Sequence, residues 1–319
     1  MQILRSTPPP VHRIERLWVH PDAADGFRTA VSLHSHTLHS REGLEFIPRV
    51  LSKVGAASAA LRALESGHRR KTGGDVPYES TMFHIGVHNL PPDDAMLLFR
   101  DMQRVTSGEA PNLLGPLLQL LDSLPEVLLV LNHPLSNEHR TTIRSHTRLL
   151  HRFLREHKSS IHALELNGLQ PHRNNRRVAE IASEIGLPVV SGGDRHCLEP
   201  SANVNLTQAS TFSEFVTEIR REGVSHVLFM PQYREATSCR YVEFISEAVR
   251  TYPEFIGRER WVDRVYKETE AGERPLAHFW PRGGPWPIRA FVAAVAILAS
   301  PQMRPTLRMA LRAQAEVVA

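Results

Sequence analysis

The chain has 319 residues, 41% of them hydrophobic, and its 38 Lys and Arg against 34 Asp and Glu give a formal net charge of +4. This composition excludes a largely disordered chain, and so mild and dispersed an excess of positive charge does not indicate a nucleic-acid-binding groove. Two cysteines in a chain of this length exclude a disulfide framework and favour a reducing, cytoplasmic setting.

Strands and helices are predicted to alternate along most of the chain. In chain order the predictions are a strand at 28–36, a helix at 47–65, a strand at 82–87, helices at 92–103 and 113–124, a strand at 126–132, a helix at 138–156, a strand at 161–167, a helix at 174–185, a strand at 187–191, a helix at 212–221 and a strand at 225–230. Such alternation predicts an α/β fold whose strands pair in parallel through crossover helices.

Composition divides the chain into an N-terminal extension (1–27), a strand and helix region (28–235) and a C-terminal helical extension (236–319). The first residues contain no apolar run of signal-peptide type. The most apolar run, 290–299, is too short to cross a bilayer, so we expect no membrane association. We interpret that run as a buried or dimer-facing helix, which leaves a homodimer open.

Histidines and acidic residues follow several predicted strands. The chain has 18 histidines against roughly seven or eight at ordinary usage, which favours a metal site. His34 and His36 lie two apart in a strand and therefore share a face, and Asp194 and His196 repeat this spacing. His133 ends the apolar strand before a proline. Because parallel barrels place active sites at the carboxyl ends of strands, we expect these side chains to meet. Mixed imidazole and carboxylate ligands suit zinc, manganese or iron.

Other polar residues near the predicted strand ends allow more than one interpretation. Glu165 could touch a metal or orient its ligands. His39 could bind a further ion or face solvent. His84 and His88 share one face of a short strand, so one of them could join the cluster or serve as a structural histidine.

Four segments together resemble motifs of the polymerase and histidinol phosphatase (PHP) family. They are Leu33-His-Ser-His-Thr-Leu-His-Ser, Asn132-His-Pro, Glu165-Leu-Asn-Gly and Gly192-Gly-Asp-Arg-His. The resemblance covers about residues 28–230 and implies a distorted TIM-like (β/α)7 barrel with a di- or trinuclear metal site. The metal ligands that it implies are His34, His36, Glu79, His133, Asp194 and His196, with His39 as a further candidate.

One family motif has no counterpart in this chain. The Thr-Asp-His motif, expected between Gly43 and Tyr78, is missing, and the interval is short, so the barrel is expected to lack one β/α unit.

The resemblance implies a phosphoesterase that hydrolyses a small-molecule phosphate ester through a metal-bound hydroxide. Nucleic acid as the substrate stays open but is not indicated by the charge pattern. An amidohydrolase also begins with His-x-His, but the chain shows no strand-end lysine to bridge its metals. The alternative from another class is a catalytically silent, PHP-like metal-binding or interaction module, which the missing motif favours.

Overall fold

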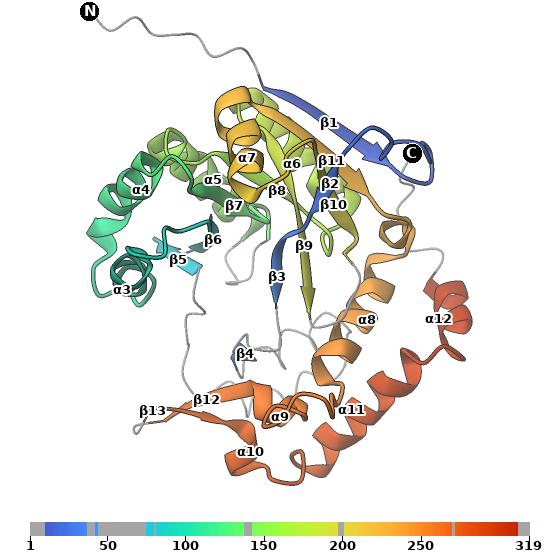
Figure 1. The fold of residues 1–319 in the computed structure, drawn as a ribbon. Helices are drawn as coiled ribbons and strands as arrows, with labels where there is room; N and C mark the ends of the chain where they lie inside the picture. Colours follow the sequence, from blue (N-terminus) through green and yellow to red (C-terminus); the bar gives the residue numbers. More distant parts are fainter. Residues whose placement is uncertain are drawn as a thin grey trace, which may run out of the picture. The chain divides into compact units, whose positions relative to one another are not determined.

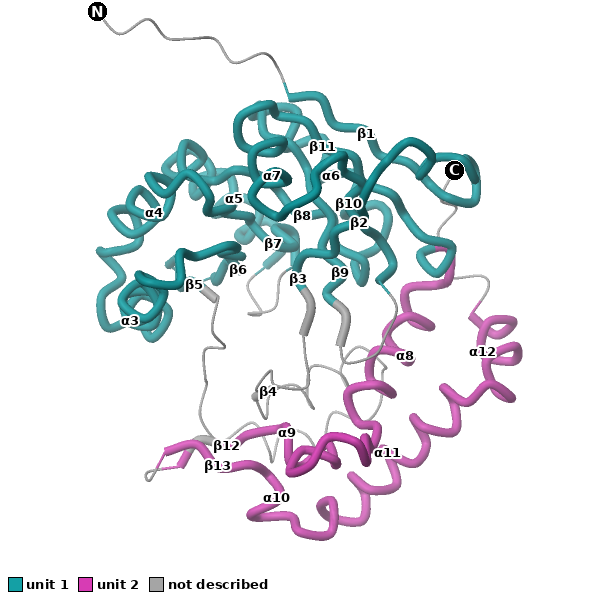
Figure 2. Tube along the Cα trace, viewed as in Figure 1, with its two compact units in different colours: residues 1–34, 73–194, 201–233 teal, residues 35–72, 195–200, 234–319 magenta. Residues whose placement is uncertain are grey.

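The computed structural model describes residues 10–36, 42–43, 75–79, 81–136, 142–196, 201–269 and 272–311, so the predicted helix at 47–65 lies outside the described residues. The chain divides into two compact units, coloured separately in Figure 2. Unit 1 comprises residues 1–34, 73–194 and 201–233, and unit 2 comprises 35–72, 195–200 and 234–319. The fold is of mixed α/β type, and the larger sheets belong mainly to unit 1.

A six-stranded sheet curls into a half-barrel (Figure 1). Its strands, in spatial order, are β3 (Leu33–His36), β9 (Val189–His196), β8 (Ala163–Asn167), β7 (Leu128–Asn132), β6 (Thr81–His88) and β5 (Asp75–Tyr78). Strands β7, β8 and β9 pair in parallel, as predicted, and every residue of β7 and β8 is buried. The prediction of parallel pairing is wrong for β6, which pairs antiparallel with β7 and with β5, a strand that was not predicted. A tight turn joins β5 to β6, and so short a connection permits only an antiparallel hairpin.

A second sheet of unit 1 has four strands, in the order β1 (Val11–Arg16), β11 (Val224–Phe229), β10 (Asn203–Thr207) and β2 (Thr29–Val31). Sequence analysis did not predict β1 or β10. The side chain of Asn205 connects the two sheets, because it bonds to the backbone N–H and the hydroxyl of Ser191 in β9 and to the carbonyl of Val31 in β2, each at 2.8–3.2 Å.

Helices cover both faces of the curled sheet. In unit 1 they are α3 (Ala95–Thr106), η1 (Pro111–Leu113), α4 (Leu114–Ser123), α5 (Ile143–His157), α6 (His172–Ile185), α7 (Phe212–Thr217), η2 (Glu218–Glu222) and η3 (Pro231–Arg234). On one face, Phe153 of α5 packs against Phe83 of β6, with ring centroids 4.8 Å apart. On the other face, α7 buries Phe215 and Val216 in an apolar cluster. The core therefore lies on both sides of the sheet.

The face that α7 covers is apolar at one end and polar at the other. Its apolar members include Leu128, Val130, Ala163 and Val190. Side chains two positions apart in a strand share a face. The same face therefore continues, toward the carboxyl ends of β7, β8 and β9, into Asn132, Glu165, Asn167, Gly192 and Asp194. The alternation thus places polar residues together at one end of the half-barrel.

Unit 2 contains the C-terminal helices and a small sheet. Its elements are α8 (Thr237–Val249), α9 (Trp261–Arg264), β12 (Val265–Thr269), β13 (Gly272–Pro275), α10 (Leu276–Phe279), α11 (Trp286–Leu298) and α12 (Arg304–Leu311), and the sheet order is β13, β12, β4 (Glu42–Gly43). Trp261, Val262, Val265 and Leu276 form its core.

Most of the apolar run at 290–299 lies in α11, and the interpretation of this helix as buried within the chain is wrong, whereas the alternative of a dimer-facing helix stays a prediction. Only Val295 of the helix is buried, whereas Trp286 is 78% and Ile297 60% exposed. Within the part of the chain that the structure describes, every helix is too short or too polar to pass through a bilayer.

Candidate metal centre

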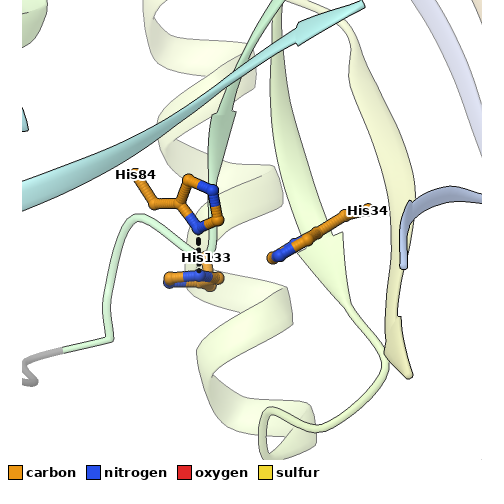
Figure 3. Close-up of side chains that lie close together, drawn as sticks. All are labelled: His34, His84 and His133. Carbon is orange, nitrogen blue, oxygen red and sulfur yellow. Dashed lines mark hydrogen bonds between the residues drawn. The ribbon is translucent and has the colours of Figure 1, made fainter. Parts of the chain in front are cut away.

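Three histidines from separate strands converge at the polar end of the half-barrel. His34 belongs to β3, His84 to β6, and His133 directly follows β7. One nitrogen of each ring lies within 4.8 Å of the other two, and Figure 3 shows the rings turned toward a common point. His84 Nδ1 and His133 Nε2 are 3.2 Å apart. Zinc bonds to nitrogen of about 2.0–2.1 Å at tetrahedral angles separate two ligand nitrogens by roughly 3.3 Å. The spacing of this pair therefore fits a shared ion.

A carboxylate borders the histidines. Asp194 Oδ1 lies 3.5 Å from His34 Nε2, and Asp194 Oδ2 accepts a hydrogen bond of 3.1 Å from the Asn167 side-chain amide. Asp194 is mostly buried, with 17% of its side chain exposed. Three imidazoles and one carboxylate form a donor set that zinc, manganese and iron accept.

The backbone is strained at three of the predicted ligands. The φ angles of His34, His133 and Asp194 are +42°, +28° and +46°, in the left-handed region that residues other than glycine seldom adopt. Each such residue costs about 1–3 kcal/mol and persists only where surrounding contacts hold it, which is common at functional sites. Three strained residues close together make this end of the sheet a candidate functional site.

The buried carboxylate of Glu165 contacts two of the three histidines. Its side chain is 1% exposed, and Oε1 lies 2.8 Å from His34 Nδ1. Oε2 accepts a hydrogen bond of 2.6 Å from the backbone N–H of His133. Gly192 makes room for this carboxylate, because a Cβ at that position would lie 1.4 Å from Glu165 Oε1. Of the two roles open to Glu165, the contacts favour orienting the histidines.

Two further histidines surround the centre without belonging to the group. Burial, and next the proximity of His34, lower the pKa of His88 to about 4, so its ring is neutral at physiological pH. The His146 ring in α5 bonds to the carbonyl of Pro134 at 2.9 Å and to the Thr81 hydroxyl at 2.8 Å. Burial lowers the pKa of His146 as well. His146 thereby fixes the turn that follows His133.

The structure brings together His34, His133 and Asp194 from the predicted ligands and adds His84, which the sequence left undecided. Glu79 is outside the histidine group: it occupies the turn after β5 with a φ of +51°, is half exposed and forms an ion pair with Arg152. His39 and the side chains of His36 and His196 lie outside the described residues.

Sequence could have favoured His84 only through the pairing of its strand. His84 is opposite Asn132, the residue before His133, whereas His88 is opposite Leu128 at the far end of β7. That register is not readable from local periodicity.

No family model matches the chain, and no curated protein matches it significantly.

Proposed function

We propose that the protein is a metal-dependent hydrolase of the phosphoesterase class, in which His34, His84, His133 and Asp194 hold a divalent ion. The observation that carries the proposal is the convergence of three imidazoles beside a carboxylate at one end of the half-barrel, with His34, His133 and Asp194 on strained backbone. The PHP-like motifs support phosphate esters as the substrate class. On this proposal the half-barrel belongs to a (β/α)7 barrel that lacks one unit, and His36, His39 and His196 are candidates for holding a further ion.

A bound divalent ion would lower the pKa of a coordinated water toward neutrality and offset charge on phosphate oxygens. The chain's own residues supply the holding geometry. His84 Nδ1 and His133 Nε2 already stand at ligand spacing, and the amide of Asn167 orients the Asp194 carboxylate. The expected substrate is a small phosphoester.

A second candidate is a metal-binding module without turnover. The observation that favours it is the ion pair between Glu79 and Arg152, which occupies a carboxylate that the PHP resemblance assigns to the metals. With Glu79 so engaged, a single ion is the better fit to the described residues. One ion would then bind, but the second ion that would help to offset the charge on a phosphoryl group would be missing, which favours binding without turnover.

Metal content tests the site and turnover separates the two candidates. We would measure zinc, manganese and iron per chain by elemental analysis in the wild type, in the His84→Ala plus His133→Ala variant, and in His20→Ala, an exposed histidine outside the group, as the matched control. We expect at least one ion per chain in the wild type and the control and a loss in the double variant.

The metal-loaded wild type would then be assayed with p-nitrophenyl phosphate and bis-p-nitrophenyl phosphate. Hydrolysis that the double variant lacks supports the phosphoesterase. Bound metal without hydrolysis of either ester supports the silent module, and equal metal content in all three proteins refutes the site.

A further inference from the structure

Glu165 is the most buried carboxylate near the histidines, and its two oxygens face different ligands. The geometry points to Glu165 as a positioning residue that fixes the tautomer of the His34 ring and the backbone of His133, so that both rings direct Nε2 toward one metal ion. This inference rests on the proposed metal site, but its first readout is made without metal. It explains why a carboxylate is buried at position 165, which the group of three histidines does not explain by itself.

The neighbouring amide shows which partner donates to Glu165 Oε1. The side-chain oxygen of Asn167 accepts a hydrogen bond of 2.8 Å from the backbone N–H of Leu169, so its NH2 group must point the other way. That NH2 group lies 3.4 Å from Glu165 Oε1 and 3.1 Å from Asp194 Oδ2. Oε1 is therefore an acceptor, and the hydrogen in its 2.8 Å bond to His34 belongs to Nδ1 of the ring.

A neutral imidazole that carries its proton on Nδ1 has its lone pair on Nε2. Metal-binding histidines commonly donate their other ring N–H to a carboxylate, which sets the tautomer and the ring orientation. His34 Nε2 is the nitrogen that lies on the Asp194 side of the ring, 3.5 Å from that carboxylate. Glu165 thus selects the form of His34 in which the correct nitrogen is a ligand.

The second oxygen of Glu165 holds His133 through its main chain. Oε2 accepts the His133 N–H at 2.6 Å, a short bond of the charge-assisted kind. His133 has a φ of +28° and directly precedes the turn that His146 binds. The contact thus holds the residue in a backbone conformation that it would seldom adopt alone, and this conformation puts Nε2 at 3.2 Å from His84.

The surroundings hold Glu165 itself in place. The carboxylate packs directly against Gly192 of β9, in the place that a Cβ at that position would occupy. Asn167 lies in the same strand as Glu165, and the Asn175 side chain of α6 holds its backbone. Asn175 accepts a hydrogen bond of 2.9 Å from the Asn167 N–H and donates one of 2.8 Å to the Asn167 carbonyl and one of 2.7 Å to the Tyr233 hydroxyl. A carboxylate confined in this way can transmit a fixed geometry to both histidines.

The test compares the wild type with Glu165→Gln, which keeps the size of the side chain, and with Glu180→Gln, an exposed glutamate of α6, as the matched control. If the Gln oxygen stays on the His133 N–H, its NH2 group faces His34 Nδ1. His34 must then accept there and place its hydrogen on Nε2. Nitrogen-15 chemical shifts of the His34 ring in metal-free protein, at a pH where the ring is neutral, report the tautomer directly.

We expect His34 to carry its hydrogen on Nδ1 in the wild type and in the control, and on Nε2 in Glu165→Gln. Titration with Co²⁺ should show a 10- to 100-fold weaker affinity in Glu165→Gln and a changed visible absorption spectrum, the range that loss of such a partner typically produces. The inference is overturned if His34 in the wild type already carries its hydrogen on Nε2. It is equally overturned if the wild type binds Co²⁺ and Glu165→Gln binds it with the same affinity.

A wild type that binds no Co²⁺ but shows the expected change of tautomer refutes the metal site while leaving the positioning contact intact. If Glu165→Gln fails to fold, the tautomer of the wild type still decides, because the structure requires hydrogen on Nδ1.

Discussion

Replacing Gly192 by alanine should disrupt the candidate centre without altering any ligand. The added Cβ would lie 1.4 Å from Glu165 Oε1 and 2.3 Å from its Cδ, so the carboxylate must leave its place. It would then lose its bonds to His34 and to the His133 N–H. Hydrogen bonds to charged groups contribute about 1.5–3 kcal/mol each, so their loss costs about 3–6 kcal/mol. Alanine reduces the conformational freedom of the unfolded chain, which stabilises the fold by about 0.4–1 kcal/mol, so the net loss is about 2–6 kcal/mol.

Gly193→Ala is the matched control, because it adds the same carbon at the next position. There the Cβ would meet only two serine hydroxyls, Ser201 Oγ at 3.2 Å and Ser32 Oγ at 3.3 Å, which can shift by a few tenths of an ångström. We expect a loss below about 1 kcal/mol, in the range of ordinary substitutions. Urea denaturation of metal-free protein measures both free energies of unfolding. Equal stabilities of the two variants would refute the placement of Glu165 against Gly192.

Three other predictions concern the framework around the site. Phe153→Ala empties a fully buried position and should lower the free energy of unfolding by about 3–5 kcal/mol in urea denaturation, whereas a loss below about 1 kcal/mol would contradict its packing. Asn205→Ala leaves the Ser191 N–H without its acceptor and should cost about 1–3 kcal/mol, with amide exchange of Ser191 accelerated; unchanged exchange would contradict the contact between the sheets. The Nδ1 of His162 accepts a hydrogen bond from the Leu129 N–H, and burial lowers the pKa of this ring. The contribution of neutral His162 to the free energy of unfolding is therefore complete above the unfolded pKa of about 6.5 and is lost as the pH falls. Below that pH, the free energy of unfolding of His162→Asn should therefore depend less on pH than that of the wild type. Equal slopes of this free energy against pH in the two proteins would contradict the lowered pKa of His162.

Local pattern was sufficient for much of unit 1. The sequence predicts β7 from its apolar run, because a strand buried on both faces needs apolar side chains throughout. It predicts α5 and α6 from their amphipathic period, because a helix buried on one side needs apolar side chains on that side alone. His34, His133 and Asp194 could be named as candidates for a similar reason. Each lies at or just beyond the end of a predicted strand, and parallel strands end at one edge of a sheet.

Contacts between distant segments decided the rest. Asn203–Thr207 alternates polar and apolar residues over only five positions, and its polar side chains are all buried. It forms β10 because it pairs with β2 and β11. The choice of His84 over His88 depends on the register between β6 and β7. The role of Glu165 depends on a ring 131 positions away in the chain. By itself, the sequence determined the central buried strands β7, β8 and β9, the amphipathic helices α5 and α6, and which strand ends carry ligand-type side chains, because these follow from local periodicity. Only the tertiary structure decided which of those side chains meet, because strand register, antiparallel pairing and the room left by Gly192 arise from long-range packing.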